Sequence, residues 1–142
     1  MRTLLILFTA TVISACSNTP TQTGSNSTLA PCPNAPHCVS SVEAGSKHIT
    51  AITVTSAEQW QLLQETLLAM PRTNVAERRP NYLHAVSHSA IMRYRDDVEL
   101  RYTPANNRVD VRSASRLGYY DFEVNRERIE TLRNQFNTTK HD

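Results

Sequence analysis

The chain has 142 residues and a formal net charge of +2, which favours one domain and excludes a strongly basic nucleic-acid-binding protein. Three cysteines are too few for a disulfide-rich miniprotein, and three glycines and seven prolines exclude a fibrous repeat. No apolar run reaches the roughly 18 residues of a membrane-spanning helix, and no motif calls for a cofactor.

The first 15 residues resemble the signal peptide of a bacterial lipoprotein. Arg2 supplies a positive charge, residues 4–13 supply an apolar segment, and the letters ISAC at residues 13–16 resemble a lipobox. The resemblance implies cleavage before Cys16 and acylation of its thiol, which holds the protein at a membrane. Because Ser17 rather than Asp follows, the sorting rule of such lipoproteins implies the outer membrane, facing the periplasm. An ordinary secretory signal with a coincidental cysteine is the alternative.

Residues 16–30 are predicted to be the lipidated cysteine and a flexible tether, because twelve of the fourteen residues after Cys16 are Ser, Thr, Asn, Gln, Gly or Pro. A single domain is expected over residues 31–138. At its start, Cys32 and Cys38 form an isolated pair, for which an oxidising compartment favours a disulfide. Free redox thiols are one alternative. A metal site with His37 is another, but its spacing fits no common zinc motif and a fourth ligand is missing.

Hydrophobic periodicity predicts the next elements. Residues 48–55 have the Ile, Thr and Val content of a strand. A capping box at Ser56 and Gln59, followed by Trp60, Leu63 and Leu67, predicts a helix over 57–69. Strands are then predicted over 73–79 and 82–88.

The following hairpin alternates between apolar and charged residues. One face is predicted to carry Met92, Tyr94, Val98, Leu100, Tyr102, Val109 and Val111. The other is predicted to be hydrated and carries Arg93, Arg95, Asp97, Glu99, Arg101, Arg108, Asp110 and Arg112. Opposite charges favour the register in which Glu99 faces Arg112 and Arg101 faces Asp110, with the turn at residues 105–106.

A final helix is predicted after an N-cap at Asn125, with Val124 and Ile129 as a hydrophobic staple. Its apolar stripe contains Ile129, Leu132 and Phe136. The order of elements predicts an α+β two-layer sandwich: an antiparallel sheet of about five strands with two helices on one face.

Two stretches of this domain carry a family resemblance. The first is CPNAPHCVSS at residues 32–41; the second comprises DDVE at 96–99, VRSASRLGY at 111–119, and then Asp121, Asn125, Arg126 and Glu130. They resemble domain-of-unknown-function family 1499, an uncharacterised bacterial and plastid family. Ala35, His37 and Glu123 stand where Ser, Asn and Gly are usual, and the last departure weakens the inference that residue 123 requires a positive φ. The resemblance implies an envelope or lumen protein and no particular reaction.

Arginine dominates the basic residues, with nine arginines among eight acids between residues 93 and 133. Arginine suits bidentate pairing with carboxylate or phosphate. In one interpretation Arg112, Arg116 and Arg126 line a pocket for an anionic envelope ligand. In the other, which we favour, the arginines form ion pairs that tie the sheet to the final helix.

Asp96 lies on the apolar side of its predicted strand, whereas Asp97 is expected to point to water. Because a buried carboxylate needs a partner, Asp96 is predicted to be at least half buried and hydrogen-bonded to Arg116 or to backbone of residues 113–121. Asp121 is expected to brace the same loop.

These patterns favour a membrane-anchored envelope lipoprotein whose domain is a binding or assembly module for an envelope ligand or protein. The candidate ligand-binding residues are Asp96, Arg112, Ser115, Arg116, Asp121, Asn125 and Arg126. The alternative is a small hydrolase-like envelope enzyme using Asp96, Arg112, Ser115 and Arg116. No Gly-x-Ser-x-Gly elbow or phosphate-binding glycine loop supports an enzyme, and His84 and His88 lie about 13 Å apart along a strand, too far for one metal ion.

Overall fold

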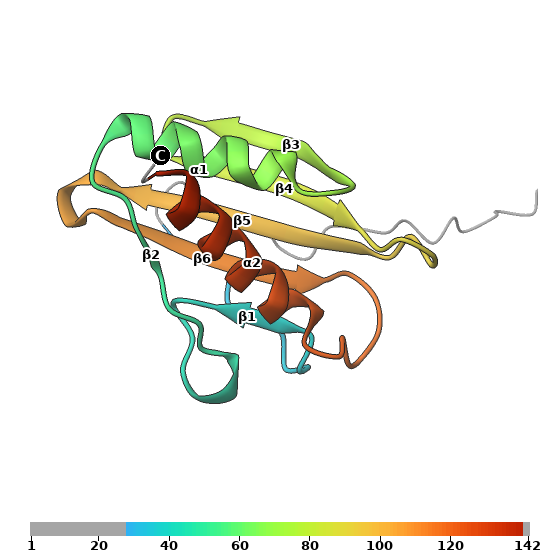
Figure 1. Ribbon diagram of the computed structural model, residues 1–142. Coiled ribbons are helices and arrows are strands. Elements are labelled where there is room, and N and C mark those ends of the chain that lie inside the picture. The colour runs from blue at the N-terminus through green and yellow to red at the C-terminus, as the bar shows by residue number, and fades with distance from the viewer. Residues whose placement is uncertain (1–27, 141–142) are drawn as a thin grey trace, which may run out of the picture.

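An antiparallel sheet of six strands forms the base of the structure, a computed structural model that describes residues 28–140 (Figure 1). The strands are β1 (Cys38–Ser40), β2 (Ile52–Thr53), β3 (Thr73–Arg79), β4 (Tyr82–His88), β5 (Arg95–Thr103) and β6 (Arg108–Ser115). Their order is β1-β6-β5-β4-β3, and β2 also pairs with β6. Two short 3₁₀ helices lie in the connections: η1 (Gly45–Lys47) and η2 (Pro104–Asn106).

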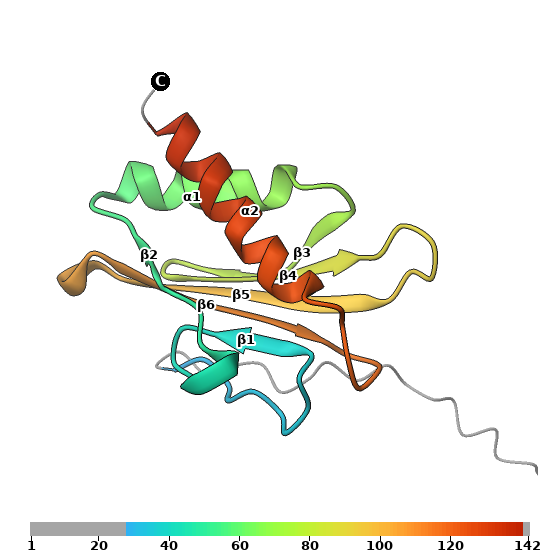
Figure 2. The same cartoon turned by 60° about the horizontal axis from the view of Figure 1, so that its bottom comes forward.

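Two helices, α1 (Ala57–Ala69) and α2 (Val124–Thr139), cover the same face of this sheet (Figure 2). The core between the layers contains the predicted helix residues Trp60, Leu63, Leu67, Ile129, Leu132 and Phe136. From the sheet it receives Leu83, Ala85, Val98, Leu100, Val109 and Val111. The predicted α+β two-layer sandwich is therefore confirmed.

The register of the β5–β6 hairpin is the one predicted from charge. Glu99 pairs with Arg112 and Arg101 with Asp110. The bounds of α1, β3 and β4 also agree with the predicted ranges. Local periodicity and cross-strand charge therefore determine these elements.

Two strand predictions need correction. Only Ile52–Thr53 of the predicted strand 48–55 joins the sheet as a strand. β5 begins at Arg95, so Met92 and Tyr94 lie in the preceding loop, and they are 64 % and 46 % exposed instead of facing the core. Their apolar side chains extend the alternating pattern of β5 into a segment that is not part of the strand.

The sheet face opposite the helices is buried at its centre, so the prediction of a hydrated face is wrong. Asp97, Glu99 and Arg112 on this face are each at most 1 % exposed. The first described segment, residues 28–37, lies on this side of the sheet (Figure 2). Opposite charges on neighbouring strands allow the burial, because Arg112 Nη1 lies 2.8 Å from Glu99 Oε2.

Tyr82 adds a pH-dependent contact to the same face. Its hydroxyl donates a hydrogen bond to Glu99 at 2.6 Å, and burial followed by this bond raises the pKa of Tyr82. The unfolded chain loses this proton near pH 10, whereas the folded chain keeps it. The contribution of Tyr82 to the free energy of unfolding is therefore complete below about pH 10 and decreases as the pH rises above it.

We therefore expect the free energy of unfolding to fall by about 1.4 kcal/mol per pH unit above about pH 10 because of Tyr82. Tyr82→Phe has no proton to lose and is expected to remove this part of the decline. Urea denaturation of both proteins between about pH 9 and 11 measures the two slopes. Equal slopes would show that Tyr82 titrates alike in the folded and unfolded chains.

Cys32 and Cys38 form the predicted disulfide. Closing a loop of this size stabilises the folded chain by about 2–2.5 kcal/mol in the chain-entropy model. The bond joins the segment before the sheet to β1, and the Cys32 N–H also donates to the Glu43 carboxylate at 2.7 Å.

The predicted signal peptide, Cys16 and most of the predicted tether lie outside the described residues. Leu29 and Ala30, at the end of the predicted tether, are 5 % and 7 % exposed and so belong to the folded part. Within residues 28–140, no helix has both the length and the apolar character needed to cross a bilayer.

The start of α2 differs from the prediction. Asn125 lies inside the first turn and is not the N-cap. The Asp121 carboxylate accepts the backbone N–H groups of Glu123 and Asn125 at 3.3 and 3.1 Å, so Asp121 braces this turn as expected. Val124, the predicted staple residue, is 42 % exposed.

Glu123 adopts a left-handed backbone conformation with φ of 64°, although glycine is absent from this position. A side chain in this region is strained, whereas glycine is not, and the ion pair of Glu123 with Arg126 is an exposed one that contributes little. We expect Glu123→Gly to raise the free energy of unfolding by about 0.5–1 kcal/mol in thermal denaturation. Glu123→Ala keeps the Cβ atom and is the control; an equal gain there would refute the backbone explanation.

Candidate functional site

A pocket of about 580 Å³ opens where two loops meet at one end of the sheet. Loop A (residues 89–94) joins β4 to β5, and loop B (residues 116–123) joins β6 to α2 (Figure 1). The apolar walls are Tyr94, Leu117, Tyr120, Phe122 and Val124. The polar floor is formed by Asp96, Ser115 and Asp121.

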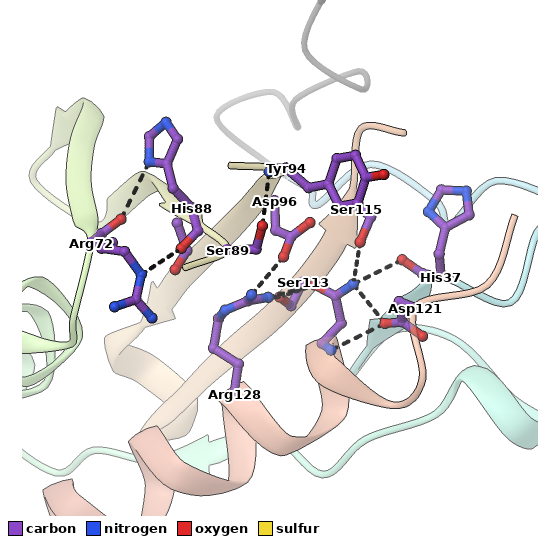
Figure 3. A network of polar contacts seen from close by, with 12 residues as sticks. His37, Arg72, His88, Ser89, Tyr94, Asp96, Ser113, Ser115, Asp121 and Arg128 are labelled. Carbon is purple, nitrogen blue, oxygen red and sulfur yellow. Dashed lines mark hydrogen bonds and ion pairs between the residues drawn. The ribbon is translucent and has the colours of Figure 1, made fainter. Parts of the chain in front are cut away.

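An ion pair lies at this floor. Asp96 is 4 % exposed, and its Oδ2 accepts a hydrogen bond from Arg128 Nη2 at 2.6 Å. Figure 3 shows the Arg128 side chain extending from α2 toward Asp96 on β5. The predicted burial of Asp96 is therefore confirmed. The predicted partner is wrong, because the guanidinium comes from Arg128 and not from Arg116.

Asn125 is the centre of the hydrogen-bond network beside this ion pair. It is fully buried, and its amide nitrogen donates to three oxygens at 2.7–3.1 Å while its amide oxygen accepts two hydrogen bonds at 2.6 and 2.7 Å. The partners are the His37 carbonyl and the side chains of Ser113, Ser115, Asp121 and Arg128. This one side chain therefore connects α2, β6, loop B and the segment before β1.

The three arginines predicted to line a ligand pocket make internal contacts instead. Arg112 pairs with Glu99 and Arg116 with Asp97, at 2.8 and 2.7 Å, on the face opposite the helices. Arg126 donates to two backbone carbonyls at and after η1. None of the three is among the residues that line the pocket between loops A and B.

The four residues of the enzyme alternative fall on two faces of the sheet. Asp96 and Ser115 are cross-strand partners at the pocket, whereas Arg112 and Arg116 point to the other side. Because side chains alternate along a strand, the two pairs do not meet at one reacting atom. The histidine His84 is in contact with the buried Asp97, with 2.7 Å between His84 Nε2 and the carboxylate. Within residues 28–140, no group of three or more His, Cys, Asp or Glu side chains could hold a metal ion.

The stretches that build this site match a known family. A family model described as protein of unknown function (DUF1499) matches residues 28–136. The chain belongs to this family. The match spans the sheet and α2 as far as Phe136, so it confirms the resemblance drawn from the two motifs. No curated protein and no solved structure matches this DUF1499 chain.

The fold of this DUF1499 protein brings together Asp96, Ser115, Asp121 and Asn125, four of the predicted ligand-binding residues. Sequence reasoning missed Arg128 and the apolar walls. A signal for Arg128 was present: it lies three residues after Asn125 and four before Leu132, which places it on the side of α2 that faces the sheet. The exposed aromatic residues of loop B gave no periodic pattern to interpret.

Proposed function

We propose that this protein is a cell-envelope lipoprotein whose domain binds an amphipathic envelope component between loops A and B. Residues 1–15 and Cys16 support the lipid anchor, and the disulfide is consistent with an oxidising compartment. The pocket is the observation that carries the binding role, because it combines apolar walls with a fixed polar floor.

The pocket has the size and composition of a small-molecule site. Its volume of about 580 Å³ falls within the range of ligand pockets, about 300–1,000 Å³. The floor is held in place by the hydrogen bonds of Asn125 and by the pair of Asp96 with Arg128. A ligand therefore meets polar groups that are already oriented, which lowers the entropic cost of binding.

The charges of the floor favour a particular headgroup. Asp96 and Asp121 line the pocket, and the guanidinium of Arg128 is already paired with Asp96. Arg112 and Arg116 pair with acids on the other face of the sheet, and the exposed Arg93 and Arg95 are not among the residues that line the pocket. The complementary ligand is therefore an apolar molecule with a cationic or hydrogen-bond-donating headgroup.

The binding role can be tested with probes that share one alkyl chain: octylammonium, octanol and octanoate. In NMR titrations we expect amide shifts in loops A and B, with affinity falling in that order. Leu117→Ser is expected to weaken octylammonium binding about tenfold by removing apolar contact. Val75→Ser on β3 is the matched control, since Val75 and Leu117 are 49 % and 51 % exposed. Shifts outside the loops, or a preference for octanoate, would overturn the proposed site.

The anchor has its own test. Mass spectrometry of the protein isolated from its native membrane is expected to show a diacylglyceryl group on an N-terminal Cys16. An unmodified N-terminus at any other residue would remove the anchor from the proposal and leave the pocket to be judged by the titrations.

A further inference from the structure

We infer that the two loops around the pocket dock onto the surface of a phospholipid bilayer. The docking surface is the rim formed by Ile91, Met92, Leu117, Tyr119, Tyr120 and Phe122. The inference rests on the proposed lipid anchor for its biological setting, and the pocket would then open directly onto the membrane from which an amphipathic ligand comes.

Apolar exposure is concentrated at this end of the molecule. Of the ten large hydrophobic side chains that are exposed in the described residues, eight lie in or next to loops A and B. Ile91 and Phe122 are 89 % and 80 % exposed, so their side chains extend into solvent. A soluble surface rarely gathers so many apolar side chains without an interaction partner.

The chemistry of the rim fits the interface of a bilayer. Tyrosine combines an apolar ring with a polar hydroxyl, and it is enriched at the headgroup level of membranes. Proteins that bind to a membrane surface insert their apolar side chains at the same boundary. In loop A, Arg93 follows the apolar Ile91 and Met92 and precedes Tyr94. Both Arg93 and Arg95 are exposed. A bilayer offers hydrocarbon for the apolar side chains and, in the adjacent headgroup layer, phosphates for the guanidinium groups.

Left-handed backbone conformations occur in both loops. Arg93 and Phe122 both have φ of 53°, and Gly118 has φ of 90°. Left-handed conformations of non-glycine residues are unfavourable, and they concentrate at functional segments. Tyr120 and Phe122 also pack edge to face with ring centroids 5.2 Å apart, so the two rings of loop B support each other in solvent.

The chain is long enough for the rim to reach the membrane from the proposed anchor. Thr28, the first described residue, is twelve positions after Cys16, which corresponds to a maximum span of about 40 Å. The nine residues of β5, which run the length of the sheet, measure about 30 Å. The anchor therefore places no geometric limit on which end of the domain contacts the bilayer.

The test uses a tryptophan reporter in the full lipoprotein reconstituted into vesicles of phosphatidylethanolamine and phosphatidylglycerol. Tyr119→Trp places the reporter on the rim, and Thr138→Trp places the control near the far end of α2. The native Trp60 is buried and bonded to Pro80, at the opposite end of β4 from loop A. We expect lipids brominated near the headgroup to quench the reporter at position 119 at least about threefold more than the one at position 138.

A second measurement concerns the rim itself. The double variant Ile91→Ser with Phe122→Ser is expected to reduce this quenching about tenfold or more, because each loses contact with hydrocarbon. Equal quenching at positions 119 and 138, or none at 119, would overturn the inference. So would a change in the emission at position 119 that follows protein concentration without vesicles, since the rim would then join two copies of the chain.

Failure of the anchor and failure of docking are distinguishable in this design. If mass spectrometry finds no acyl group, the same reporter can be titrated with vesicles, and quenching at position 119 would support docking without the anchor. If the acyl group is present and position 119 is not quenched, the anchor stands and docking is refuted.

Discussion

Arg112→Met is expected to lower the free energy of unfolding by about 3–5 kcal/mol, because removing one partner of a buried ion pair leaves a buried charge without this counter-charge. Arg112 is 1 % exposed, and its Nη1 lies 2.8 Å from Glu99 Oε2. The hydrogen bond from Tyr82 to Glu99 remains in the variant but brings no positive charge.

Urea denaturation measures this loss. Arg108→Met is the matched control, because Arg108 lies on the same strand with its side chain 45 % exposed, and we expect it to cost at most about 1 kcal/mol. Glu99→Gln combined with Arg112→Met is expected to lose less than the sum of the single variants, since glutamine carries no charge that needs a partner. A loss at Arg112 no larger than at Arg108 would contradict the burial argument.

The same pair shows what the sequence could and could not predict. Strand parity and charge complementarity predicted that Glu99 and Arg112 face each other, and the register confirms it. Charged residues at every second position normally indicate a hydrated face. Here the alternating charges neutralise one another across β5 and β6, so the face can be buried. Local sequence shows the sign of each charge but not which distant segment returns to that face.

Asp96 gives the corresponding lesson for the site. Its inward direction followed from the alternation of β5, because the side chains of Val98 and Leu100 share its parity. Its partner depended on how α2 crosses the sheet, and the crossing brings Arg128 rather than Arg116 to the carboxylate. Packing between layers is a long-range property that spacing along the chain does not show. The sequence therefore predicts an arginine as the partner of Asp96 but not which arginine it is.

The apolar residues of loops A and B escape prediction for a different reason. Tyr94 lies one residue before β5 and continues its apolar alternation, so the pattern predicts a core position that the structure does not show. In loop B, Leu117 and Phe122 have no period at all. A site built on loops leaves no periodic signal, whereas the strands and helices that support it do.

A loss as large as that at Arg112 is expected from Asn125→Ala. The substitution removes five hydrogen bonds from a fully buried position. The Ser113 hydroxyl keeps its bond from Arg128 and the His37 carbonyl keeps the Ser115 N–H, whereas the Ser115 hydroxyl loses its Asn125 partner. A hydrogen bond contributes about 0.5–1.5 kcal/mol and an unsatisfied buried group costs about 1–3 kcal/mol, so we expect the free energy of unfolding to fall by about 3–5 kcal/mol. Thermal and urea denaturation measure it, with the exposed Asn134→Ala on the same helix as control.

Asn125→Asp separates hydrogen bonding from packing. Aspartate has almost the same shape, but it replaces the donating amide nitrogen by an oxygen. In the wild-type chain this nitrogen lies 2.7 Å from Asp121 Oδ2, so the variant places two carboxylates against each other. If the network holds α2 and loop B on the sheet, this variant should lose at least about 2 kcal/mol, and amide exchange in loop B should accelerate. If Asn125 merely fills space, the variant should resemble the wild type in both measurements. Because the floor of the pocket depends on this amide, octylammonium binding should weaken in Asn125→Ala, which adds no negative charge to the floor, whereas Asn134→Ala should leave it unchanged.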